Sequence, residues 1–287
     1  MSEGDTLERF DFPAHPIRGL RVRLNATWRE ALSHSDHPEP VQRLLGEAMA
    51  ATALLTATLK FRGRLSLQIG GGGELGMLLV QCDHELHLRG TASHHPVAGG
   101  QLLEAARLSL TLEPLDQGRR YQGIVPLESP ALAPAVEHYL ARSEQLPTRL
   151  WLAGGTGATA GLLLQRMPGE AADADAWNRL CRLAATVKDE ELLELPTPLL
   201  LHRLFHEEDI RLFDSRAVSF RCGCSRRRVA GVLQGLGAAE VEEILAEQGQ
   251  VEVTCEFCGR AYHFDAVDAA LLFASEQPPV SAGRTRH

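Results

Sequence analysis

FRCGCSRRR at residues 220–228 and VEVTCEFCGRAYHFD at residues 251–265 are the two stretches that decide the architecture of the C-terminal part of the chain. They hold four of the six cysteines, which fall into two close pairs: Cys222, Cys224, Cys255 and Cys258. Two pairs separated by a spacer of 30 residues allow four sulfur ligands to converge as a tetrahedron, the arrangement that zinc prefers. The pattern therefore predicts one zinc site and a small domain built around it.

The residues around the two pairs predict regular elements that fit such a domain. Gly223 and Gly259 allow tight turns beside the sulfurs, and Gly249 is typical of a helix end. The expected elements are two helices, the two strands of a hairpin and a last helix, at residues 226–236, 238–248, 251–255, 260–264 and 266–273. Ser225 and Asp265 are the expected N-caps of the first and last helices. We expect His263 to be an exposed strand residue rather than a ligand.

The chemistry of a four-sulfur site excludes some functions and leaves others open. Four protein ligands fill the coordination shell, whereas a catalytic zinc needs an open position, so a zinc hydrolase is not expected. A structural zinc ion contributes on the order of 10–16 kcal/mol to folding. The alternative hypothesis is that the four-cysteine site is a redox sensor. Zinc-bound cysteines are thiolates, and their oxidation to disulfides would release the metal. The spacing alone favours the structural role.

Residues 1–182 predict a mixed α/β domain, which gives the whole chain an α+β fold. Residues 17–24 alternate apolar side chains with arginines, as a strand buried on one face does. Residues 40–61 are rich in alanine and leucine and predict a long buried helix. Further strands are expected at residues 65–69, 77–82, 85–90, 107–113, 120–127, 148–153 and 162–167, and further helices at 129–143 and 174–187. Asp116-Gln117-Gly118 predicts a hairpin turn.

Residues 183–220 predict a helical, acidic linker between this domain and the zinc-binding domain at residues 221–274. Within it, residues 188–214 carry three positive and eight negative side chains, a net charge of -5. Leucine pairs alternate with these charges, which predicts short amphipathic helices that rest on a neighbouring domain. The polar tail at residues 275–287 is expected to be disordered.

Length and charge restrict the protein further. A chain of 287 residues can bury enough surface to fold without disulfides, and its formal net charge of -8 argues against binding to nucleic acid or to anionic membranes. The N-terminus has no signal-peptide pattern, and no apolar run is long enough to cross a membrane. We therefore expect a cytoplasmic protein that keeps its cysteines reduced or metal-bound. Cys82 and Cys181 are expected to be buried and inert.

Motifs along nearly the whole chain resemble those of the heat-shock protein 33 family, the redox-regulated bacterial chaperones. They are IRGLRVRL (17–24), LLTATLKF (54–61), RYQGIVPLE (120–128), YLARSEQLPTRLWL (139–152), LLLQRMP (162–168), LFHEEDIRLFD (204–214), FRCGCSRRR (220–228) and VEVTCEFCGRAYHFDAVD (251–268). The resemblance implies a holdase, a chaperone that binds unfolding proteins without ATP and is not an enzyme. It also implies that the reduced, zinc-bound form is inactive.

The resemblance further implies how the switch operates. Oxidation would pair Cys222 with Cys224 and Cys255 with Cys258 and release the zinc ion. The zinc domain and the linker would then unfold, and the active form would be a homodimer that holds unfolded client proteins. Two alternatives from other classes remain at this point: a zinc-ribbon adaptor with a purely structural metal, and a thiol-disulfide oxidoreductase that uses Cys255 and Cys258.

Overall fold

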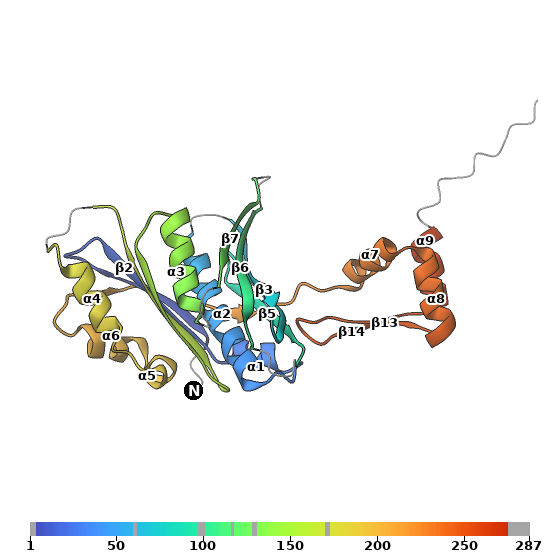
Figure 1. Ribbon diagram of the computed structural model, residues 1–287, viewed down its shortest axis with the longest axis horizontal. Helices are drawn as coiled ribbons and strands as arrows, with labels where there is room; N and C mark the ends of the chain where they lie inside the picture. The colour runs from blue at the N-terminus through green and yellow to red at the C-terminus, as the bar shows by residue number, and fades with distance from the viewer. Residues whose placement is uncertain are drawn as a thin grey trace, which may run out of the picture. The chain divides into compact units, whose positions relative to one another are not determined.

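A twenty-residue helix lies at the centre of the N-terminal part of the protein. The computed structural model describes residues 4–59, 62–96, 101–115, 118–127, 131–169 and 173–274. Helix α2 (Glu39–Thr58) is rich in alanine and leucine and is buried over most of its circumference. It lies between two β-sheets and packs against strands of both (Figure 1). The predicted long buried helix is confirmed.

Each of the two sheets has six strands. The first has the order β10-β1-β2-β9-β8, with β11 also paired to β1, and is built from β1 (Thr6–Phe12), β2 (Ile17–Leu24), β8 (Thr148–Gly154), β9 (Thr159–Arg166), β10 (Arg211–Leu212) and β11 (Arg216–Ala217). The second has the order β12-β5-β4-β3-β6-β7 and is built from β3 (Gly63–Gly72), β4 (Leu75–Asp83), β5 (His87–His94), β6 (Glu104–Pro114), β7 (Tyr121–Pro126) and β12 (Ser219–Phe220). Helices α1 (Ala26–Leu32) and α3 (Leu132–Ser143) pack beside them.

Strand β2 is buried on both faces, which differs from the burial on one face that the sequence predicts. Arg21 is 2% exposed although it is an arginine in an alternating pattern. The reason is a second layer of helices, α4 (Ala176–Ala184), α5 (Asp189–Glu194) and α6 (Thr197–Phe205), on the face of the first sheet opposite α2 (Figure 1). The expectation of a strand at these residues is confirmed, whereas the expectation that one of its faces is exposed to solvent is wrong.

Helices α5 and α6 are anchored by buried apolar side chains and by Arg21. Leu192, Leu200 and Phe205 join a buried cluster with residues of β1, β2 and β9. The Arg21 guanidinium donates to Thr197 Oγ1 at 2.6 Å and to the carbonyl of Leu192 at 3.0 Å, and also to the carbonyl of Leu195. The junction between α5 and α6 is thus held to the first sheet by one buried cation.

The segment at residues 211–220 runs along the edges of both sheets as three two-residue strands. β10 and β11 pair antiparallel with β1, and β12 pairs parallel with β5. Phe213 adds a contact, because the Arg9 and Arg211 guanidinium groups lie 5.0 and 4.9 Å from its ring centroid. Edge strands carry unpaired backbone groups. This segment therefore covers parts of two edges that would otherwise be open.

The chain divides into two compact units, Met1–Arg221 and Cys222–His287. The second contains α7 (Arg226–Leu236), α8 (Ala238–Gln248), the antiparallel pair β13 (Val251–Thr254) and β14 (Ala261–Phe264), and α9 (Ala266–Ala274). These elements confirm those predicted around the cysteines. The finer division into residues 1–182 and 183–220 stays a prediction. Asp116 and Gln117 of the predicted turn, and the predicted disordered tail at 275–287, lie outside the described residues.

Candidate metal centre

The four cysteines that the spacing pairs come together at one point of the second unit. Their sulfur atoms all lie within 4.8 Å of one another. The Sγ atoms of Cys222 and Cys255 are 3.6 Å apart, and those of Cys224 and Cys258 are 3.4 Å apart. Sulfurs bound to one zinc ion at about 2.3 Å in a regular tetrahedron would be separated by about 3.8 Å. The donor set and its dimensions therefore fit a tetrahedral metal ion.

The backbone at the second cysteine pair is folded into a tight turn. After β13, the amides of Cys258 and Gly259 both donate to the carbonyl of Cys255, at 3.3 and 2.8 Å. Gly259 has a φ of 62°, a left-handed conformation that glycine adopts without strain. At the first pair, Arg228 Nη1 donates to the carbonyl of Gly223 at 2.5 Å, and Ser225 Oγ accepts from the Arg228 amide as the helix N-cap. The predicted cap at Ser225 is confirmed.

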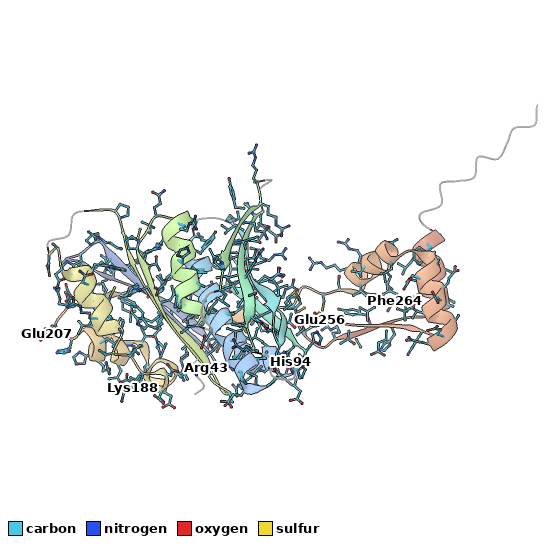
Figure 2. All side chains as sticks on the ribbon, in the orientation of Figure 1. Arg43, His94, Lys188, Glu207, Glu256 and Phe264 are labelled. Carbon is cyan, nitrogen blue, oxygen red and sulfur yellow. The ribbon has the colours of Figure 1, made fainter. Side chains whose placement is uncertain are left out.

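Arg226 connects the start of α7 to the hairpin and to the last helix. Its guanidinium lies 4.2 Å from the ring centroid of Phe264, which is labelled in Figure 2 and is 2% exposed. It also forms an ion pair of 2.7 Å with Asp268 and donates to the carbonyl of His263 at 2.7 Å. One side chain next to the first cysteine pair thus holds three parts of the unit together.

Replacing Arg226 by methionine is expected to lower the free energy of unfolding of the zinc-loaded second unit by about 1–3 kcal/mol. The variant keeps apolar volume beside Phe264 but loses the cation–π contact, the ion pair and a charged hydrogen bond. Hydrogen exchange of residues 222–274 would measure the change. Arg227→Met is the matched control, because Arg227 is exposed and we expect its loss to change stability by less than about 0.5 kcal/mol. Equal effects of the two substitutions would contradict the role assigned to Arg226.

Tyr262 is a functional residue that the sequence pattern did not reveal. Its hydroxyl donates to the Cys224 sulfur at 3.1 Å. Burial disfavours the Cys224 thiolate, but hydrogen bonds from Tyr262 and from the other cysteines outweigh it and lower the pKa of Cys224 to about 7. The only signal in the sequence is a tyrosine four residues after the second cysteine pair. This spacing does not show whether the tyrosine hydroxyl points toward the sulfurs, because that depends on the geometry of the hairpin. His263, as predicted, is exposed.

Crowding and burial of the sulfurs disfavour the thiolate form at two other cysteines of the cluster. Burial, together with hydrogen bonds to its three neighbours, raises the pKa of Cys258 to about 12, and burial likewise raises the pKa of Cys255. A divalent cation at the centre removes this conflict, because it supplies the positive charge that lets coordinating thiols deprotonate. The chemistry of the donor set therefore fits a bound metal ion.

The core of the second unit is small. Seven buried side chains form its apolar cluster among the described residues: Val229, Leu233, Val241, Val251, Tyr262, Phe264 and Ala269. A domain of this size rarely gains enough stability from apolar burial alone. A metal centre that joins the loop before α7 to the β13–β14 hairpin would therefore be a main source of stability.

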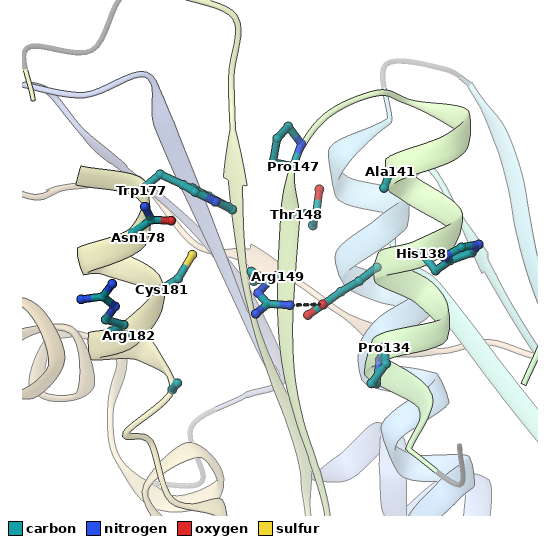
Figure 3. A pocket seen from close by; sticks show the side chains of 12 residues that line it. Pro134, His138, Ala141, Pro147, Thr148, Arg149, Trp177, Asn178, Cys181 and Arg182 are labelled. Atoms are coloured by element: carbon teal, nitrogen blue, oxygen red, sulfur yellow. Dashed lines mark hydrogen bonds and ion pairs between the residues drawn. The ribbon is translucent and has the colours of Figure 1, made fainter. Parts of the chain in front are cut away.

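The two remaining cysteines lie in the first unit. Cys82 is fully buried, as predicted, and burial raises the pKa of its thiol to about 12. Cys181 was predicted to be buried but is only half-buried. It lines a groove of about 630 Å³ between α3 and α4 (Figure 3). In this groove Arg149 pairs with Glu137 at 2.9 Å, and burial raises the pKa of Cys181 to about 11. Both thiols are therefore protonated at neutral pH and are weak nucleophiles.

The fold and the four-sulfur centre match those of one protein family. The sequence model of the family described as "Hsp33 protein" matches residues 5–265. The chain belongs to the Hsp33 family. The 33 kDa chaperonin of Nitrosococcus oceani is 47% identical over 292 aligned positions, covering 100% of both chains. That of Methylobacillus flagellatus is 46% identical over 283 positions, covering 96% of this chain and 97% of the relative.

A solved structure of an Hsp33 homologue confirms the fold. The 33 kDa chaperonin of Thermotoga maritima superposes with a TM-score of 0.82 at 21% sequence identity, covering 94% of this chain and 98% of that structure. The α+β fold and the family resemblance predicted from the motifs are thereby confirmed, and the chain is a member of a chaperone family. No helix within the described residues is long and apolar enough to cross a membrane.

Proposed function

We propose that this Hsp33-family chain is a redox-regulated holdase of the cytoplasm that binds unfolding proteins without ATP and is not an enzyme. In the resting state one zinc ion would be held by Cys222, Cys224, Cys255 and Cys258 and would keep all four as thiolates. The observation that carries the proposal is the convergence of these sulfurs in a unit with a small core. Loss of the metal would remove a large part of the stability of that unit.

The chemical step follows from the thiolate state of the ligands. A cysteine thiolate of each pair attacks a peroxide oxygen, the O–O bond breaks, and a sulfenic acid and hydroxide form. The second thiolate of the pair displaces hydroxide from that sulfenic acid and forms the disulfide. Two peroxide molecules and four protons thus convert four thiolates into the disulfides Cys222–Cys224 and Cys255–Cys258, with four water molecules as the other product. No thiolate ligand then remains.

The consequence for the rest of the chain is an order-to-disorder change. Only Arg221 separates Cys222 from the segment that covers the sheet edges, and α5 and α6 precede that segment. We propose that unfolding of the second unit extends into residues 183–220, that the exposed apolar surface holds unfolded clients, and that the active form is a homodimer. Marginally stable elements beside an unfolded region are the first to open.

The test compares the reduced and the peroxide-treated protein at about 40 °C. Free zinc is measured with a chromogenic chelator, and client aggregation is followed by light scattering. We expect the oxidised protein to release about one zinc ion per chain and to suppress aggregation at near-stoichiometric amounts, and the reduced protein to do neither. Zinc retained after oxidation would indicate a structural metal, as in an adaptor. Catalytic turnover of a dithiol substrate would instead indicate an oxidoreductase.

A further inference from the structure

One edge of the second sheet is covered by a short strand from a distant part of the chain. Strand β12 lies parallel to β5, with Ser219 opposite His87 and Phe220 opposite Leu88. The amides of Ser219 and Arg221 donate to the carbonyls of Leu86 and Leu88 at 3.2 and 3.1 Å. The chain therefore already has an extended strand of its own seated on this edge.

The side chains of that strand fill a place in the core of the first unit. Val218 is 5% exposed and belongs to the same buried cluster as Trp28 and Leu88, and Phe220 packs against this cluster. Helix α1 packs against both β12 and β5. Residues 218 and 220 are two positions apart, so both side chains point to the core while Ser219 faces solvent. If β12 is released, the apolar site that Val218 and Phe220 fill becomes accessible. The backbone hydrogen-bonding groups at the edge of β5 become accessible with it.

The edge is longer than the strand that covers it. β12 pairs with the first two residues of β5, which continues to His94 (labelled in Figure 2). Among the described residues, no other strand pairs with β5 on that side. An extended segment of six or seven residues could therefore form more backbone hydrogen bonds than β12 does. A short strand is thus a weak competitor for a longer one.

Charged side chains at this edge of β5 favour one type of residue in the bound segment. On the outer face, Arg221 Nη1 lies 3.4 Å from the ring nitrogens of His87, and His87 Nδ1 lies 3.0 Å from Asp83 Oδ2. Glu85 Oε2 is 3.6 Å from the same His87 nitrogen. Two carboxylates therefore lie near the position that follows the apolar pair, which favours a basic residue there.

We propose that residues 218–221 are an internal mimic of a client, and that release of β12 opens the edge of β5 for extended segments of unfolded proteins. The bound segment would be a parallel strand with apolar side chains at alternate positions, followed by a basic residue. This inference rests on the proposed function, because oxidation is what would free β12. Backbone pairing explains how such a site accepts many sequences, since the hydrogen bonds do not depend on the side chains.

A labelled peptide of residues 214–221, DSRAVSFR, tests the proposal by fluorescence anisotropy with the full-length protein. We expect binding to the oxidised protein and at least tenfold weaker binding to the reduced, zinc-loaded protein. N-methylation at Ser219 and Arg221 of the peptide removes the two donors and is expected to weaken binding at least tenfold. The matched control is N-methylation at Phe220, whose N–H points away from β5, and it should change affinity less than threefold. Equal binding of both methylated peptides would overturn the proposal.

A variant separates this inference from the redox switch. Val218→Ser/Phe220→Ser weakens β12 without oxidation, so we expect the reduced protein to retain its zinc and to bind the peptide, with hydrogen-exchange protection at residues 87–92. Ser219→Ala is the control and should not bind. If the oxidised wild-type protein suppresses client aggregation but the peptide protects a region other than β5, the inference is wrong and the holdase function stands. If the oxidised protein holds no client while the variant binds the peptide at β5, the proposed function is wrong and the edge site stands.

Discussion

Cys222→Ser is expected to reduce the zinc content from about one to less than about 0.1 per chain and to unfold residues 222–274. Three sulfurs bind zinc far more weakly than four, and a structural zinc ion contributes on the order of 10–16 kcal/mol to folding. That exceeds what seven buried side chains in this unit supply beyond the entropy cost of folding. Because metal binding and folding are coupled here, the loss of one ligand should remove both.

The measurement combines zinc analysis with hydrogen exchange. We expect amides of residues 222–274 to exchange at nearly unprotected rates and those of residues 183–220 to exchange faster than in the zinc-loaded protein, whereas residues 1–182 of the first unit stay protected. Cys181→Ser is the matched control, because it removes the same sulfur atom from a thiol that lies outside the cluster. It should retain zinc and the redox response. A Cys222→Ser protein with a full complement of zinc would show that this sulfur is not a ligand.

Arg21→Met is expected to lower the stability of the α5–α6 region by about 3–5 kcal/mol. Three buried or half-buried acceptors, the Thr197 hydroxyl and the carbonyls of Leu192 and Leu195, would lose their donor. Each buried acceptor without a partner costs about 1–3 kcal/mol. Hydrogen exchange at residues 189–205 should therefore accelerate more than about 100-fold, since each 1.4 kcal/mol is a factor of ten.

Arg203→Met provides the control for this experiment. Arg203 also holds this region, through a 2.6 Å ion pair with Glu191, but it is partly exposed and water can replace its contacts. We expect a loss below about 1 kcal/mol. If unfolding of α5 and α6 opens the client surface, the Arg21 variant should also gain part of the holdase activity while it still carries zinc. Unchanged exchange at residues 189–205 would contradict the anchoring role of Arg21.

Elements with a long repeating pattern could be predicted from the sequence, and elements made by contact with distant residues could not. The helix at 39–58, the strands around it and the helices after Ser225 all follow from periodicity and caps. β10, β11 and β12 have two residues each, which is too short to show a repeating pattern of apolar and polar residues. They form because β1 and β5 have edges with free backbone groups to pair with. The burial of Arg21 depends on contacts with residues that lie 171 to 176 positions later in the chain.

The candidate site shows the same division. The four cysteines were predicted to converge because their spacing and chemistry are sufficient to indicate it, and the structure brings their sulfurs together. Tyr262 and Arg226 could not be assigned their roles, since the direction of a hydroxyl or a guanidinium depends on how α7 and the hairpin pack. The half-burial of Cys181 likewise depends on the groove between α3 and α4.

The strands on the sheet edges have a consequence for the synthesis of this protein. Asp11 of β1 and its partner Arg211 are 200 residues apart, and the outer edge of β5 receives β12 only when residues 219 and 220 have been made. At about 5–20 residues per second, the outer edge of β1 stays uncovered for roughly 10–40 s on the ribosome. A nascent chain that stalls before residue 211 would carry both edges open. During its own translation, this chaperone therefore presents the same kind of surface from which it is proposed to protect others.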